Sequence, residues 1–297
     1  MKRIGKFLKD EFLTGWTPFQ IILLLVALTL QISLGFTIGV KEGQTIDINV
    51  VLSVLAPALS FVGVMLGAKQ RISTFILGPI GGAMFAYLSF ATWNNMSNFI
   101  FQVGIGIPSN FLGFFLWFKN RDNKGQALPK RMSAQGIGVV IALFISFYLT
   151  YGFLTQEWRT GGTNSISLEQ HWIDALVLAV MIFASVIMLG RYVEQWYFWI
   201  LANFAQIALY SVMIATISKD SSAYGGWMTP ATAAVSLVGY IASQINAIYG
   251  WLRWFKYYKT LPKYKIAVLT KEELNELNVM NKLKYQTNRF FTYTQKK

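Results

Sequence analysis

The segment WYFWILANFAQIALY, residues 196–210, carries aromatic and amide side chains at helical spacing. At about 100° per residue, positions three or four apart form one stripe on a helix. The stripe consists of Trp196, Trp199, Asn203, Gln206 and Tyr210. Indoles offer flat faces for stacking, and amides offer both hydrogen-bond donors and acceptors. Together they suit contact with a flat heteroaromatic ring.

Two members of this stripe also allow a structural interpretation. Trp196 fits the aromatic belt, in which indoles lie at the level of the lipid headgroups. Gln206 could hold neighbouring helices together by hydrogen bonds instead of contacting a substrate. An amide that faces lipid is unfavourable, so Asn203 and Gln206 should face protein or a hydrated cavity.

Polar and aromatic side chains of the same kinds occur in other apolar segments. We therefore predict a substrate site that draws on several helices. Its ten residues are Tyr87, Gln102, Asn110, Trp196, Trp199, Asn203, Gln206, Tyr210, Gln244 and Asn246.

Groups that drive covalent or ion-coupled chemistry are scarce in this chain. It has no cysteine and one histidine, His171, which falls near the end of an apolar run. No phosphate-binding loop, H-E-x-x-H or G-x-S-x-G motif occurs. No acid falls at the centre of an apolar run, where proton and sodium relays need ionisable groups. We expect no cofactor, metal or catalytic residue, and passive transport rather than enzymatic activity. An ion-coupled transporter and a membrane-embedded enzyme remain the competing interpretations.

The composition places these residues in a membrane. The chain is 54% hydrophobic and 13% charged, against about 25% charged in soluble domains. The uncharged runs 21–39 and 137–154 are long enough to cross a hydrocarbon core of about 30 Å. We predict an all-α polytopic membrane protein. Its eight spans are 17–40, 50–67, 74–92, 98–118, 134–154, 171–190, 196–217 and 229–254.

The net charge of +13 is explained by the way the basic residues are distributed. Of the 26 Lys and Arg residues, only Lys41, Arg159 and Lys219 fall in segments on one side of the predicted spans. Such a bias predicts a protein of the cell membrane in which the opposite side, which carries the other basic residues and both termini, faces the cytoplasm. Membrane lipids, and not a nucleic acid, are therefore the expected partner of this charge.

Parts of the chain repeat. Three matches recur in the same order: Leu66-Gly67 with Leu189-Gly190, Tyr87 with Tyr210, and GFFLWFK (113–119) with GWLRWFK (250–256). A single span between the copies makes them parallel repeats, which place substrate sites at their interface. We predict a 1 + (3+1+3) arrangement with these parts: 1–48, an interfacial helix and an extra span; 49–119, the first repeat; 120–169, a linker with the central span; 170–256, the second repeat; and 257–297, a basic cytoplasmic tail.

The segment RYVEQWYFW (191–199), followed by Asn203, resembles the W-x-x-W-x-x-x-N region of the PnuC family of vitamin transporters. NFLGFFLW (110–117), and Asn246 with Trp251, resemble the family's other repeat landmarks. The resemblance covers about residues 50–256. The third span departs from it, because GPIGG (78–82) stands where many members carry an asparagine.

This resemblance implies a SWEET-like bundle that assembles as a homotrimer. It implies facilitated uptake of nicotinamide riboside, which a cytoplasmic kinase traps by phosphorylation; relatives take up thiamine or deoxynucleosides, and these remain alternatives. It also implies that Trp196, Trp199, Asn203 and Asn246 line the pocket.

Overall fold

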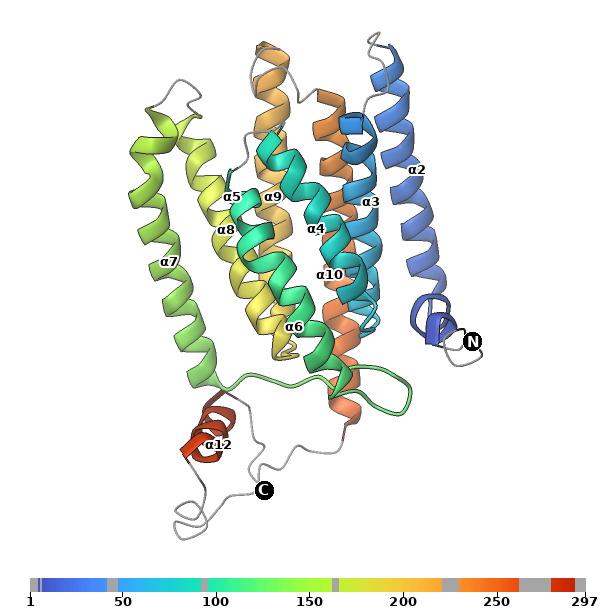
Figure 1. Cartoon of the computed structure of the whole chain (residues 1–297), viewed down its shortest axis with the longest axis vertical. Helices are drawn as coiled ribbons and strands as arrows, with labels where there is room; N and C mark the ends of the chain where they lie inside the picture. Colours follow the sequence, from blue (N-terminus) through green and yellow to red (C-terminus); the bar gives the residue numbers. More distant parts are fainter. Residues whose placement is uncertain are drawn as a thin grey trace.

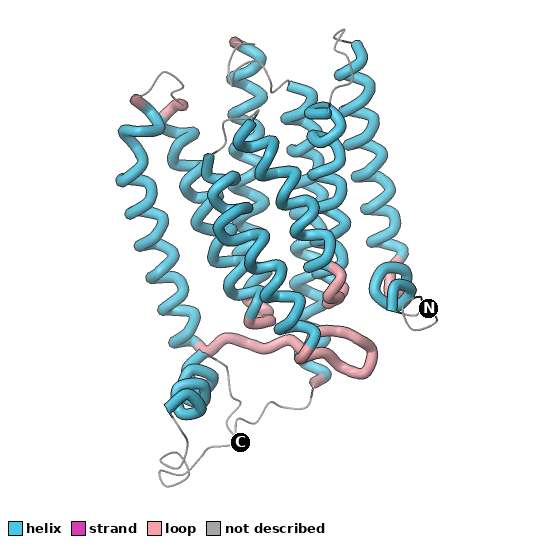
Figure 2. The backbone as a smooth tube through the Cα atoms, viewed as in Figure 1, coloured by secondary structure: helices cyan, strands magenta, loops and turns pink. Residues whose placement is uncertain are grey.

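The computed structural model describes residues 5, 7–41, 48–91, 96–161, 166–220, 230–261 and 279–291. These residues form helices and loops, with two isolated β-bridges and no strand (Figures 1 and 2). The helices are η1 (Lys9–Leu13), α2 (Pro18–Lys41), α3 (Ile48–Ala68), α4 (Thr74–Ala91), α5 (Met96–Phe101), η2 (Gln102–Gly106), α6 (Ile107–Phe118), α7 (Ala134–Thr160), α8 (Leu168–Leu189), α9 (Gln195–Lys219), α10 (Pro230–Thr260) and α12 (Val279–Phe291).

Seven of the described helical segments are long and apolar enough to cross a membrane. The apolar part of α4, Thr74–Phe90, is shorter, so its crossing as an eighth span stays a prediction. The all-helical, multi-span fold is confirmed. Two helices extend beyond the predicted spans, to Thr160 in α7 and Thr260 in α10. Polar contacts support these extensions, since Arg159 pairs with Asp174 and the Tyr257 hydroxyl donates to Asp122.

The helices pack as two groups of three. The first three-helix group contains α3, α4 and the continuous α5–η2–α6 segment; the second contains α8, α9 and α10. The groups meet reciprocally, because α10 packs on α3 and α6 packs on α8. The α2 helix packs on α3 and α10, and α7 packs on α8, so these two helices lie at opposite edges of the bundle (Figure 1). This packing is what parallel repeats would produce, although the repeat relation itself stays a prediction.

The fourth predicted span contains a π-helical turn. Gln102–Gly106 adopts the wider i→i+5 winding between α5 and α6. Gly104 and Gly106 tolerate this backbone, and Pro108 lacks an amide donor at the start of α6. Single π-helical turns of this kind often occur at functional sites. Here the turn begins at Gln102, one of the predicted site residues.

One end of the bundle is basic. The loops after α3 and α8, and the 119–133 segment that runs beneath the bundle in Figure 2, carry Lys69, Arg71, Lys130 and Arg191. We call this the basic end.

The N-terminal segment is bound to this end. It was expected as an interfacial helix, but part of it packs into the protein. Glu11 of η1 is 2% exposed and accepts a hydrogen bond from the Ser73 amide at 3.2 Å. Residues 262–278 of the predicted C-terminal tail fall outside the described residues. Further along the tail, α12 docks on the start of α7, where the Ser133 amide donates to the Phe291 carbonyl.

Candidate functional site

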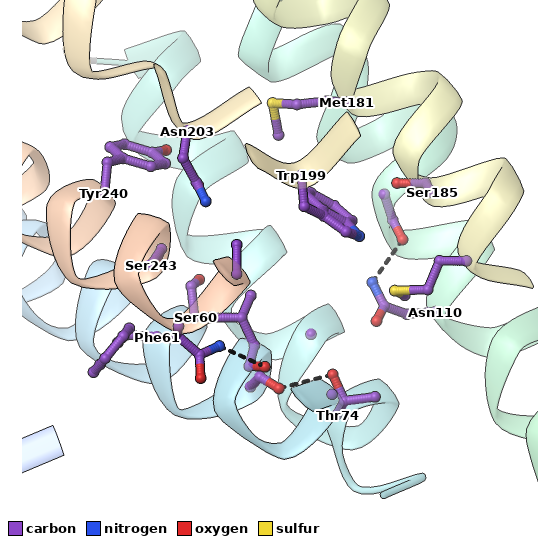
Figure 3. Close-up of a pocket in the computed structure, with 18 of the residues that line it drawn as sticks. Ser60, Phe61, Thr74, Asn110, Met181, Ser185, Trp199, Asn203, Tyr240 and Ser243 are labelled. Carbon is purple, nitrogen blue, oxygen red and sulfur yellow. Dashed lines mark hydrogen bonds between the residues drawn. The ribbon is translucent and has the colours of Figure 1, made fainter. Parts of the chain in front are cut away.

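A cavity of about 190 Å³ lies between the two three-helix groups (Figure 3). Six elements line it: α3, α4, α5–η2–α6, α8, α9 and α10. Its polar lining consists of hydroxyls and amides. Among the described lining residues, none carries a carboxylate, an ammonium, a guanidinium or an imidazole group. The cavity can therefore recognise a ligand by stacking and neutral hydrogen bonds, and it offers no fixed charge for an ion.

Six of the ten predicted residues line this cavity: Gln102, Asn110, Trp196, Trp199, Asn203 and Asn246. Trp199 and Asn203 come from α9 and project toward the centre of the view in Figure 3. The α9 helix begins at Gln195, which follows the loop after α8, so its first turn is already beside the cavity. The structure thus brings together the first half of the predicted stripe.

The second half of the stripe lies beyond the cavity. Gln206 is 2% exposed, and its Nε2 donates to the sulfur of Met181 at 3.3 Å. Tyr210 is buried against Tyr240, with ring centroids 5.4 Å apart. Both contacts reach cavity-lining residues, so Gln206 and Tyr210 support the wall from behind. For Gln206 this arrangement matches the interpretation as helix-to-helix packing.

Two other predicted residues do not line the cavity. Tyr87 was predicted as a site residue, but its side chain is 46% exposed on α4 and does not line the cavity. It stands nine residues after Gly78, which does line the cavity, and nine steps of about 100° turn a side chain to the opposite face. Gln244 is buried in α10 beside the cavity residues Ser243 and Tyr240 without lining the cavity itself.

Glycines in α4 make room for two amides. A Cβ at Gly78 would lie 2.6 Å from Cγ of Asn110, and a Cβ at Gly82 would lie 2.9 Å from Oε1 of Gln102. Asn110 Nδ2 donates to the Gly106 carbonyl at 2.7 Å, and Gln102 Nε2 donates to Asn98 Oδ1 at 3.3 Å. The α4 helix therefore approaches α6 and η2 closely at GPIGG (78–82). This approach places two amide groups in the cavity wall.

The two groups contribute unequal walls from matching positions. The loops after α3 and α8 each contain a residue in the left-handed conformation, Gln70 (φ 63°) and Arg191 (φ 61°). Eight and twelve residues later come Gly78 and Gly82 in α4, but Trp199 and Asn203 in α9. The bulky pair thus projects from one side, and the glycine pair leaves space on the other.

Several polar atoms in the wall lack a protein partner within the described residues. Asn246 Nδ2 donates to the Val64 carbonyl at 3.2 Å, whereas its Oδ1 is buried without a partner. The indole nitrogen of Trp196 and the side-chain nitrogen of Gln195 are in the same situation. Buried polar atoms are normally satisfied, so these three are positioned for water or for a polar ligand.

The sequence-based selection missed most of the hydroxyls that line the cavity. These are Ser60, Thr74, Ser109, Ser185, Ser236, Ser243 and the phenol of Tyr240. Serine and threonine in apolar helices commonly bond to their own backbone, as Ser109 does to the Gly106 carbonyl. Their presence in a span is therefore weak evidence of a site.

Comparisons with known proteins identify the family. The model of a family described as "Nicotinamide mononucleotide transporter" matches residues 50–256. The nicotinamide riboside transporter PnuC of Haemophilus influenzae is 27% identical over 260 residues, covering 85% of this chain and 96% of that protein. The PnuC of Neisseria mucosa is 26% identical over 265 residues, covering 87% and 90%.

A solved structure agrees in fold. The crystal structure of the vitamin B3 transporter PnuC matches with a TM-score of 0.66 at 24% identity, covering 86% of this chain and 97% of that one. The expected PnuC resemblance is thereby confirmed, and the function is transport rather than catalysis. This chain is a multi-pass membrane protein that belongs to the nicotinamide mononucleotide transporter family.

Proposed function

We propose that this protein takes up nicotinamide riboside by facilitated diffusion, with the cavity between the two three-helix groups as the substrate site. The observation that carries the proposal is the composition of that cavity: three indoles, two of them predicted, four predicted amides and no fixed charge among the described lining residues. The names of the Haemophilus and Neisseria relatives support the choice of substrate.

Each part of the substrate has a suitable group in the wall. The nicotinamide ring is a flat cation, which Trp196 and Trp199 can attract through their ring faces. Its carboxamide can donate to the free Oδ1 of Asn246 or bond to Asn203. The ribose hydroxyls can bond to Gln102 and Asn110, whose amides the glycines of α4 admit to the wall.

The absence of charge in the described lining supports passive transport. A proton or sodium ion needs an ionisable or strongly coordinating group on its path, and a driving ion usually binds near the substrate. The substrate gradient is then the remaining driving force. Continued uptake requires that the product be removed inside the cell, and the family resemblance supports phosphorylation by a cytoplasmic kinase. The same resemblance supports a homotrimer.

We further propose that the protein lies in the cell membrane with its basic end facing the cytoplasm, because Lys and Arg concentrate on the cytoplasmic side of membrane proteins. The cysteine-free chain allows a direct test with single cysteines. Lys119→Cys at the basic end should react with an impermeant thiol reagent in inside-out vesicles. Trp158→Cys, which is 60% exposed near the other end of α7, should react in intact cells. The reverse pattern would exclude this orientation.

Calorimetry on the purified protein tests the substrate. Nicotinamide riboside should bind more tightly than thiamine or thymidine, because thymidine lacks both the charge and the 2′-hydroxyl, and a site built to bond a hydroxyl rejects a ligand without it. Heat with thymidine and none with nicotinamide riboside would assign the chain to deoxynucleoside transport instead.

Proteoliposomes test the energetics. Counterflow of nicotinamide riboside should proceed without any ion gradient and should be insensitive to a protonophore. Accumulation against the substrate gradient, driven by an imposed sodium or proton gradient in vesicles without kinase and ATP, would show ion coupling and contradict passive transport.

A further inference from the structure

Four aromatic rings form a continuous chain at the basic end of the bundle. Phe75 of α4 meets Trp117 of α6 edge-on, with centroids 4.8 Å apart and an interplanar angle of 88°. Trp117 meets Trp254 of α10 at 5.3 Å. Trp254 meets Trp196 of α9 at 6.0 Å, again edge-on, at 71°. The chain therefore crosses from one three-helix group to the other. We call it the four-ring layer.

The two halves of this layer occupy matching positions in the two groups. Phe75 and Trp196 each stand five residues after the left-handed residue of their loop, Gln70 or Arg191. Trp117 and Trp254 each stand four residues after a glycine, in GFFLW (113–117) and GWLRW (250–254).

The two glycines perform the same task in the two groups. A Cβ at Gly113 would overlap the Phe75 ring, and a Cβ at Gly250 would lie 2.5 Å from Cη2 of Trp196. Each glycine therefore seats the aromatic ring that comes from the second helix of its own group. One turn later in each case, a tryptophan reaches the opposite group.

Reciprocal hydrogen bonds join the two halves. Trp117 Nε1 donates to the Met188 carbonyl of α8 at 3.0 Å, and Trp254 Nε1 donates to the Gly67 carbonyl of α3 at 3.1 Å. Both acceptors stand three residues before the left-handed residue of their loop. Each three-helix group thus holds the end of the first helix of the other group through one indole.

The four-ring layer lies at one boundary of the cavity. Trp117 and Trp196 line the cavity, and so do the two residues whose carbonyls accept the indole bonds, Gly67 and Met188. Trp254 does not line it, and both Trp117 and Trp254 are 0% exposed. The rings and their acceptors come from the helix ends at the basic end. The layer therefore stands between the cavity and that end.

We propose that the four-ring layer is the gate through which the substrate leaves the cavity at the basic end, and that it opens when both indole–carbonyl bonds break. This inference rests on the proposed transport through this cavity. The two indole bonds link the groups across the layer, together with the ring contact between Trp117 and Trp254. Two neighbouring bonds, from Asn246 to the Val64 carbonyl and from Arg191 to the Asn120 carbonyl, join the same groups, so loss of the indole bonds weakens the junction at this end. Both carbonyls that accept the indoles also accept a backbone amide, from Gln70 or Arg191, and belong to the last turns of helices, where water can replace the indole. Trp196 belongs to both the cavity wall and the gate, so a ligand that stacks on it acts directly on the ring that contacts Trp254.

Thiol labelling inside the cavity tests the gate without any substrate. Ser60→Cys places one thiol in the cavity wall of a chain that has no other cysteine. In membrane vesicles that expose the basic end, Trp117→Phe or Trp254→Phe should raise the rate of labelling by an impermeant reagent about two- to tenfold, the effect of losing one hydrogen bond. Because the two bonds hold the same pair of groups, the factors should multiply in the double variant.

The matched control is Trp251→Phe. Trp251 lies on α10 close to Trp254, but its indole nitrogen makes no hydrogen bond within the described residues. Its replacement should leave the labelling rate unchanged. Vesicles that expose the opposite end should show no increase for any variant.

Two results would overturn the gate: unchanged labelling in both indole variants, or an equal increase from both ends, which would indicate general loosening. Elution of each variant as a single species checks that it is folded. If an indole variant misfolds, Phe75→Leu replaces it in the test; this variant keeps both indole–carbonyl bonds and should raise the labelling rate by a smaller factor. Failure of the substrate proposal would give a different result: the parent chain would not bind nicotinamide riboside, while the variants would still show the expected labelling rates.

Discussion

Gly78 of α4 faces the side chain of Asn110 in α6 so closely that a Cβ at position 78 would lie 2.6 Å from the amide carbon. At the matching position of the second three-helix group stands Trp199. The cavity therefore carries a large ring on one wall and, on the other, a glycine whose space is taken by an amide. Two similar helix groups thus present unequal walls to the cavity.

Gly78→Ala should weaken binding of nicotinamide riboside. The new methyl group must displace Asn110, whose Nδ2 is held by the Gly106 carbonyl, so the amide loses its place in the wall. Loss of one hydrogen bond corresponds to about a two- to tenfold lower affinity. Calorimetry would measure it. Gly104→Ala is the control, because a Cβ at that glycine of η2 meets no atom within 4 Å. Equal affinities in the two variants would remove Asn110 from the site.

Trp199→Ala should remove a stacking surface worth roughly 0.5–2 kcal/mol for a cationic ring. The affinity for nicotinamide riboside should then fall about two- to thirtyfold. Asn203→Leu should also weaken binding, since it replaces an amide in the wall with an alkyl group. Phe204→Ala serves as the comparison, because Phe204 is 58% exposed on the outer side of the same helix. If the first two variants bind like the parent chain, the stripe on α9 is packing.

Lys69 should make the stability of the protein depend on pH. Its side chain is fully buried, with Nζ 4.0 Å from the ring centre of Trp16. Burial is the main cause that lowers the pKa of Lys69 from 10.5 to about 7; the charges of Arg71 and Arg253 contribute to the lowering, and Glu11 opposes it. Between about pH 7 and pH 10.5 the unfolded chain holds a proton that the folded chain releases, so the free energy of unfolding should rise with pH in this window.

Lys69→Met should abolish this dependence. Relative to the variant, the parent chain should be least stable below pH 7 and should gain stability as the pH rises toward 10. Thermal unfolding of both proteins in the same detergent, at pH 6.5 and pH 9.5, measures the difference. Lys119→Met, at an exposed position, should show the same pH dependence as the parent chain. A constant gap between the parent chain and Lys69→Met at the two pH values would contradict the prediction.

Asp174→Asn should destabilise the contact between α7 and α8. Arg159 and Asp174 are both buried and lie 3.4 Å apart, so the variant leaves a buried guanidinium without its counter-charge. Removing one partner of a buried ion pair destabilises by about 3–5 kcal/mol, whereas replacing both by apolar residues destabilises far less. The double variant Arg159→Met/Asp174→Leu should therefore unfold at a higher temperature than Asp174→Asn. Glu157→Gln, on the exposed side of the same turn, should be neutral.

The sequence alone determined the elements of this protein. Every predicted span coincides with an observed helical segment, because a long apolar run that crosses a bilayer satisfies its backbone hydrogen bonds within a helix. The first half of the α9 stripe was also predictable. Trp196, Trp199 and Asn203 are less than two turns apart on one helix, so their common face follows from helical geometry alone.

Only the tertiary structure decided how the two three-helix groups pack against each other and which side chains face the cavity. The sequence match pairs Leu66-Gly67 with Leu189-Gly190, and hence Tyr87 with Tyr210. Aligning the left-handed residues Gln70 and Arg191 instead gives an offset that differs by two residues, and this alignment no longer pairs the exposed Tyr87 with the buried Tyr210. A shift of two residues rotates a helix face by about 200°, which is enough to turn a site residue toward lipid. Hydrogen bonds at the helix ends join the two groups, such as those of Trp117 and Trp254, whose partners lie 71 and 187 residues away in the chain. Contacts at such separations leave no local pattern, and for this reason the cavity wall and the four-ring layer became visible only in the folded protein.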